Sequence, residues 1–62
     1  MNKYDLYIGK EIMCICGLKC DMNYTVISDV YEKDDDEVFN VHDENGNIEI
    51  IYVDYLDEYT VI

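Results

Sequence analysis

The dipeptide Asn45-Gly46 constrains this chain more than any other local feature, because it separates two segments typical of β-strands. Asn and Gly both tolerate the positive φ angles of a tight hairpin turn, which joins neighbouring antiparallel strands. The segments on either side, residues 37–42 (EVFNVH) and 48–53 (IEIIYV), are rich in β-branched and aromatic residues. The sequence therefore predicts a β-hairpin over residues 37–53.

The rest of the chain continues this β-rich pattern. Residues 10–16 (KEIMCIC) and 24–32 (YTVISDVYE) alternate in the manner of strands, and an irregular loop separates them. The charge run at 33–36 should end the second strand in a turn, because adjacent like charges oppose regular pairing. Residues 54–59 (DYLDEY) have the length and acidic start of a single 3₁₀ or helical turn, and 60–62 should form a short last strand.

This order of elements is found in SH3-like barrels. We therefore expect an all-β fold, a small five-stranded SH3-like barrel with one 3₁₀ or helical turn before the last strand. Closing two short sheets around one core also covers the exposed edges that a small β protein must protect. The residues expected in the core are Ile12, Cys14, Val26, Val30, Phe39, Val41, Ile50, Tyr52, Leu56 and Val61.

The length of 62 residues indicates one domain over residues 1–62, because a chain this short supports a single hydrophobic core. Residues 1–9 alternate weakly before Gly9, which predicts an extra strand or a flexible arm. No proline, linker or internal repeat divides the sequence.

Charge is the outlying property of the composition. Fifteen Asp and Glu residues against four Lys give a formal net charge of −11. Such a surface repels nucleic acid phosphates and anionic membranes, so we expect neither direct nucleic acid binding nor membrane association.

The location expected is the cytoplasm of a bacterial host. The longest uncharged run, residues 12–18, is far below the roughly 20 residues that span a bilayer, and the first residues lack the apolar core of a signal peptide. An odd number of cysteines, Cys14, Cys16 and Cys20, packed closely together suits a reducing compartment.

Several short motifs lie along the chain from residue 9 onward: Tyr24-Thr25-Val26, Phe39-Asn40-Val41, Asp43 with Gly46, and Tyr52 with the segment 54–59. In these motifs the chain resembles the small uncharacterised SH3-like proteins of Firmicutes and their phages. The resemblance implies an SH3-like fold and an origin in a phage or mobile element, and it brings no catalytic residues. The chain departs from the family pattern over residues 10–23, where the cysteines are denser and the loop is shorter.

Metal binding and catalysis are the less favoured hypotheses. Cys14, Cys16, Cys20 and His42 are a candidate zinc set, but the C-x-C spacing differs from the usual C-x₂₋₄-C, and small core cysteines explain it as well. No D-x-D-x-D-G loop points to calcium. With a single His and no nucleophile–base pair or phosphate-binding loop, we expect no enzyme and no cofactor.

Acidic residues gather in three places, each with a turn signal. We expect them to bind a basic protein surface, with tyrosines of the last segment as anchors. The candidate partner-binding residues are Asp34, Asp35, Asp36, Glu37, Asp43, Glu44, Asp54, Tyr55, Asp57, Glu58 and Tyr59.

Two functions follow from this pattern. The first is an acidic phage or mobile-element inhibitor that mimics the charge of nucleic acid and blocks a host DNA- or RNA-binding protein. Small acidic phage proteins similar to this one inhibit restriction enzymes, CRISPR nucleases, nucleoid proteins or RNA polymerase. The second is a generic SH3-like interaction module that binds a basic or extended peptide through its aromatic residues, with the acidity serving only solubility. The sequence leaves the oligomeric state open.

Overall fold

The structure, a computed structural model, describes residues 1–17 and 21–62 and is all-β apart from two short 3₁₀ helices. Every strand pairing in these ranges is antiparallel. The elements are η1 (Lys3–Asp5), β1 (Glu11–Cys14), β2 (Asn23–Val26), β3 (Tyr31–Lys33), β4 (Asp36–Asp43), β5 (Ile48–Tyr52), η2 (Val53–Glu58) and β6 (Tyr59–Val61).

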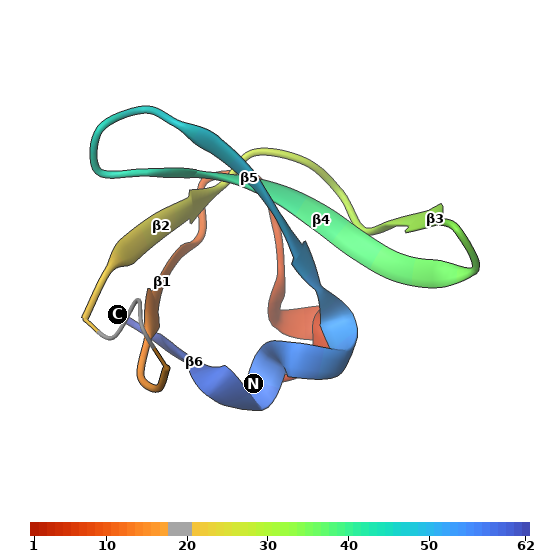
Figure 1. The fold of residues 1–62 in the computed structure, drawn as a ribbon, viewed down its shortest axis with the longest axis horizontal. Coiled ribbons are helices and arrows are strands. Elements are labelled where there is room, and N and C mark those ends of the chain that lie inside the picture. The colour runs from red at the N-terminus through yellow and green to blue at the C-terminus, as the bar shows by residue number, and fades with distance from the viewer. Residues whose placement is uncertain (18–20) are drawn as a thin grey trace.

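The strands form one bent sheet that wraps around the core. Its order is β3-β4-β2-β1-β6, and β5 pairs with the other edge of β4. Figure 1 shows β4 and β5 on one side of the molecule, β1 and β6 on the other, and η2 connecting β5 to β6. A closed barrel would need β5 and β6 to pair with each other. Instead β5 pairs with β4 and β6 pairs with β1, so the described strands do not close into a complete barrel.

The core prediction is correct for six of its ten positions and wrong for three. Ile12, Cys14, Val26, Phe39, Val41 and Leu56 are buried, and Val30 is half-buried against them. Ile50, Tyr52 and Val61 are instead 42 to 44% exposed. The structure adds Tyr24, Val38 and Ile51 to the buried residues.

The error on β5 has a simple physical cause. The strand carries apolar side chains on both faces, so its alternation does not decide which face turns inward. Pairing with β4 places Ile51 opposite the fully buried Phe39, and the Ile48, Ile50 and Tyr52 face lies outside.

The single strand expected over residues 24–32 is in fact two strands, β2 and β3. The break lies at Ser28, whose hydroxyl accepts a hydrogen bond from the Asn40 backbone N–H at 2.8 Å and donates one to the Asp29 carbonyl at 2.9 Å. The side chain thus takes a place that a backbone group would hold in a continuous ladder. After the break, β3 pairs with the first part of β4.

The acidic run after β3 is a tight hairpin turn. Lys33 pairs with Asp36, so only Asp34 and Asp35 form the loop between β3 and β4. Their φ angles are +51° and +69°, the left-handed conformation that two-residue hairpin turns require and that Asp tolerates better than most residues. The expected turn is confirmed. The like charges do not prevent β3 and β4 from pairing up to the residues that flank the turn, Lys33 and Asp36.

The hairpin predicted at Asn45-Gly46 is confirmed. His42 pairs with Ile48, and Gly46 has a φ angle of +85°. The helical turn and the short last strand predicted near the C-terminus are also present, as η2 and β6.

Residues 1–9 form no extra strand. They contain η1, whose start is stabilised by a capping box: the Asn2 side chain accepts a hydrogen bond from the Tyr4 N–H, and the Asp5 carboxylate accepts one from the Asn2 N–H. Leu6 packs against the core, and the Gly9 N–H donates to the Val26 carbonyl at 2.8 Å. This segment therefore packs onto the sheet.

Candidate binding surface

The three acidic groups do not form one continuous face. Strand β4 is eight residues long, with the β3–β4 turn at its start and the β4–β5 turn at its end. At about 3.3 Å per residue, these two turns lie more than 20 Å apart along the strand. Figure 1 shows them on opposite sides of the molecule.

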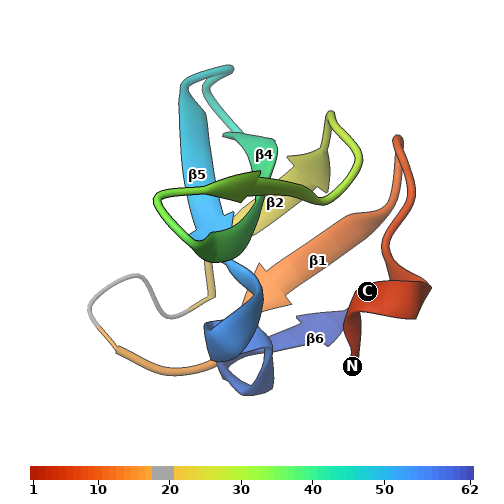
Figure 2. The same ribbon diagram turned by 90° about the vertical axis from the view of Figure 1, so that its right-hand side faces the viewer.

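The β3–β4 turn and η2 do lie at the same end of β4. Val38, near the start of β4, pairs with Tyr52, the last residue of β5, and η2 begins at the next residue. In the view of Figure 2 the β3–β4 hairpin lies above η2, and Figure 1 shows its turn extending to the right, away from η2. We name this region the acidic end and define it by its seven carboxylate residues. They are Asp34, Asp35, Asp36, Glu37, Asp54, Asp57 and Glu58.

Two of the described lysines lie within the acidic end. Lys3 donates to both carboxylate oxygens of Glu37, at 2.9 and 3.0 Å, and Lys33 is the register partner of Asp36. The hydrogen bond from Lys3 to Glu37 and the charge of Glu37 raise the pKa of the Lys3 ammonium. Glu37 is thus paired with a lysine. Among the described residues, no ion pair engages the other six carboxylates, although Glu58 interacts with the Cys16 thiol.

At the opposite end of β4, Asp43 has an internal role. Only 6% of this residue is exposed, and its carboxylate accepts hydrogen bonds from the backbone N–H groups of Asn45 and Asn47, both at 2.9 Å. The Asn47 side chain donates a third at 3.3 Å. Asp43 therefore stabilises the hairpin turn, and Glu44 is the exposed acidic residue there.

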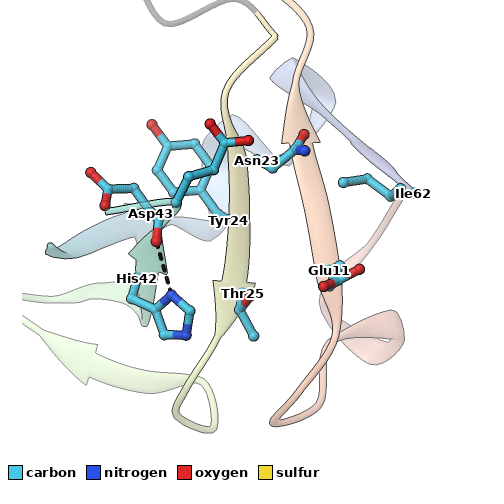
Figure 3. Close-up of a pocket in the computed structure, with 8 residues that line it drawn as sticks. Glu11, Asn23, Tyr24, Thr25, His42, Asp43 and Ile62 are labelled. Atoms are coloured by element: carbon cyan, nitrogen blue, oxygen red, sulfur yellow. Dashed lines mark hydrogen bonds between the residues drawn. The ribbon is translucent and has the colours of Figure 1, made fainter. Parts of the chain in front are cut away.

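A shallow depression of about 340 Å³ lies beside this turn, over β1, β2 and β4. Figure 3 shows His42 and Thr25 side by side in it, with Glu11 on the far strand. The His42 Nδ1 lies 3.0 Å from the Asp43 carbonyl oxygen. The other lining residues are Asn23, Tyr24, Asp43, Glu44 and Ile62.

The candidate zinc set is not brought together among the residues that the structure describes, and Cys20 lies outside them. Cys14 is buried in the core and donates to the Cys16 carbonyl at 3.0 Å, whereas His42 is on the opposite face of the sheet. Desolvation, followed by the charge of Glu58, raises the pKa of the Cys16 thiol and makes the thiolate that binds metal less available. Residues 1–17 and 21–62 contain no group of three or more Cys, His, Asp and Glu side chains that could hold a metal ion.

Tyrosines gather next to the acidic end. The rings of Tyr52 and Tyr55 are stacked, with centroids 6.1 Å apart and planes at 29°. Tyr59 is half-buried and meets Tyr24 edge to face at 6.2 Å. Burial of the phenol raises the pKa of Tyr59 to about 12, with smaller contributions from Cys14 and Tyr24.

A second depression of about 340 Å³ lies between β5 and η2, and we name it the tyrosine groove. Tyr55 and Tyr59 were expected in a binding surface, whereas Ile50 was placed in the core by the sequence. The sequence signal that could have indicated an exposed Ile50 is the apolar pattern on both faces of β5. The groove is lined by Ile50, Ile51, Tyr52, Tyr55, Glu58 and Tyr59.

Comparison with protein-family models, curated proteins and solved structures finds no match to this chain. No helix within the described part of the chain is long and apolar enough to span a membrane.

Proposed function

We propose that this protein is a non-enzymatic acidic binding protein that covers the nucleic-acid-binding surface of a basic partner. One observation carries the proposal: the pairing of Val38 with Tyr52 brings the β3–β4 turn and η2 to the same end of the molecule. Six carboxylates that are not paired with Lys3 lie on this turn, at the start of β4 and on η2, and two stacked tyrosines lie at the junction of β5 and η2.

Charge density at this end supports the proposal. A nucleic-acid-binding surface is built to neutralise closely spaced phosphates with Lys and Arg, and it attracts any rigid array of anions of similar spacing. Asp34, Asp35 and Asp36 are adjacent in the chain and are held by a tight hairpin. Because that backbone is already ordered, little conformational freedom is lost when a partner binds.

The fold that we propose for this scaffold is an open SH3-like barrel. The support for this fold is the 3₁₀ helix η2 before the last strand, and the return of β6 to pair with β1. The phage or mobile-element origin that we propose rests on the sequence resemblance alone. On this proposal the target belongs to the host. The target classes are a defence nuclease such as a restriction enzyme or a CRISPR nuclease, a nucleoid protein, and RNA polymerase.

The tyrosine groove favours a second candidate function, an SH3-like module that binds a basic or extended peptide. Its aromatic lining beside a 3₁₀ helix is the kind of surface on which extended peptides dock. In this function the acidity would serve only solubility, and nucleic acid would not compete with the peptide.

Affinity capture from a bacterial lysate separates the two. The immobilised chain should retain a DNA- or RNA-binding protein at low salt, release it as salt rises, and release it when duplex DNA or RNA is added. Retention of a partner that does not bind nucleic acid, and that stays bound when nucleic acid is added, would overturn the charge-mimicry proposal and support the peptide module.

A further inference from the structure

The tyrosine groove combines exposed aromatic rings with a carboxylate. Tyr52 is 43% exposed and Tyr55 is 53% exposed, although their rings stack on each other. Glu58 lines the same groove, and the side chain of Ile50 supplies an apolar wall. An aromatic ring has a negative face that attracts cations, and a nearby carboxylate strengthens that attraction.

The chain already uses tyrosine rings in this way elsewhere. The Lys3 ammonium lies 5.6 Å from the centre of the Tyr4 ring, and the Lys10 ammonium lies 5.2 Å from the centre of the Tyr7 ring. Within the ranges 1–17 and 21–62, no lysine lies over Tyr52 or Tyr55. The groove is therefore an aromatic and acidic site whose rings have no cation from the described residues.

The remaining tyrosine of the groove is a neutral wall. With its pKa raised to about 12, the Tyr59 phenol stays protonated under ordinary conditions, and its edge-to-face contact with Tyr24 fixes the ring. The negative charge in the groove is therefore concentrated on Glu58, and Tyr52 and Tyr55 offer the ring faces.

We propose that the tyrosine groove binds an arginine side chain of the partner, with the guanidinium over the Tyr52 and Tyr55 rings and paired with Glu58. This deepens the proposed function and rests on its basic partner. Arginine fits better than lysine because its guanidinium is planar, is more weakly hydrated, and can stack on a ring while donating to a carboxylate. The acidic end would attract the partner over a distance, and the groove would hold one of its side chains.

The test is a titration of the full chain with short capped peptides, followed by NMR of the tyrosine ring and backbone resonances. The probes carry a central arginine, a lysine, or citrulline, which has nearly the shape of arginine without its charge. The arginine peptide should give saturable shifts at Ile50, Tyr52 and Tyr55, and the citrulline peptide should bind at least about threefold more weakly, since cation–π contacts at partly exposed sites have this size.

Two variants and their controls locate the site. Tyr55→Leu and Glu58→Gln should each weaken arginine binding by about threefold or more. Tyr4→Leu, at an exposed ring outside the groove, and Glu44→Gln, at the opposite end of β4, should leave it unchanged. Glu58→Gln and Glu44→Gln remove the same charge. A difference between their affinities for the arginine peptide therefore reports the position of the charge and not the net charge.

Equal binding of the arginine and citrulline peptides would overturn the proposal, and so would equal losses in Glu58→Gln and Glu44→Gln. The two proposals can fail separately. If arginine binding is confirmed but no captured partner is displaced by nucleic acid, the groove stands and the mimicry fails. The opposite outcome is that the wild type and Tyr55→Leu bind the partner with equal affinity, and that nucleic acid displaces the partner from both. In that case the groove proposal fails and the mimicry stands.

Discussion

Val38 on β4 lies directly opposite Tyr52 on β5, and this pairing determines which acidic residues are neighbours. It places the start of β4, with the Asp34-Asp35 turn just before it, beside the start of η2. The same register sends the β4–β5 turn to the far end. The acidity of the chain is thus divided between a clustered end and a second end where Asp43 is used internally.

The inward face of β5 can be tested by two neighbouring substitutions of the same kind. Ile51→Ala should lower the free energy of unfolding by roughly 2 to 4 kcal/mol, because it opens a cavity beside Phe39. Ile50→Ala should cost less than about 1 kcal/mol, because that side chain is already exposed in the tyrosine groove. Urea denaturation of both variants measures the difference, and a larger loss for Ile50→Ala would show that β5 presents its other face.

The internal role of Asp43 predicts that replacing this residue destabilises the fold. Asp43→Ala should lower the free energy of unfolding by roughly 2 to 3 kcal/mol, because three donors of the hairpin turn lose a charged acceptor. Glu44→Ala, at the next residue, should change it by less than about 0.5 kcal/mol. Equal effects of the two substitutions in chemical denaturation would contradict the assignment of Asp43 to the turn.

The two-residue turn at Asp34 and Asp35 predicts that two neighbouring substitutions change the free energy of unfolding in opposite directions. Asp35→Gly should raise the free energy of unfolding by about 1 kcal/mol, because glycine adopts the φ angle of +69° without strain. Asp36→Gly removes the same charge from β4 and should lower the free energy by roughly 0.5 to 1 kcal/mol, because glycine weakens a strand. Thermal or chemical unfolding distinguishes them, and destabilisation by both would argue against the two-residue turn.

The raised pKa of Tyr59 predicts that the fold loses stability at high pH. The pKa of Tyr59 is raised to about 12 in the folded chain, mainly by burial, against about 10 when unfolded. Because the unfolded chain loses this proton first, the contribution of Tyr59 is fully present below about pH 10 and is lost as the pH rises through about 12. Free energies of unfolding measured over this range should fall less steeply for Tyr59→Phe than for the wild type. Parallel curves would contradict the raised pKa.

Turn chemistry made parts of the fold predictable. Asn45-Gly46 defines its hairpin because few other dipeptides adopt that conformation so readily, and the acidic start of 54–59 marks η2. The break at Ser28 was not predictable, because it depends on a hydrogen bond to Asn40, twelve residues away. The inward face of β5 was ambiguous because both faces are apolar.

The candidate surface was predictable as a set of residues but not as an arrangement. Runs such as Asp34-Asp35-Asp36 are visible in the sequence, whereas their proximity to η2 follows only from the register of β4 and β5. The role of Asp43 was missed because a carboxylate that accepts hydrogen bonds from its own turn has the same sequence pattern as an exposed one.

The most direct test of the charge-mimicry proposal compares two double variants that remove equal charge from opposite ends of the molecule. The Asp34→Asn/Asp54→Asn variant lies in the acidic end, and Glu11→Gln/Glu44→Gln lies around the depression beside the β4–β5 turn. Each is measured for its affinity for the captured nucleic-acid-binding partner and for its ability to displace DNA from that partner. The first variant should lose about tenfold in both measurements while the second stays close to the wild type, because charges in contact with a partner count for more than distant ones. Equal losses in the two variants would show that only net charge matters, and would contradict an acidic end built to occupy a nucleic-acid-binding surface.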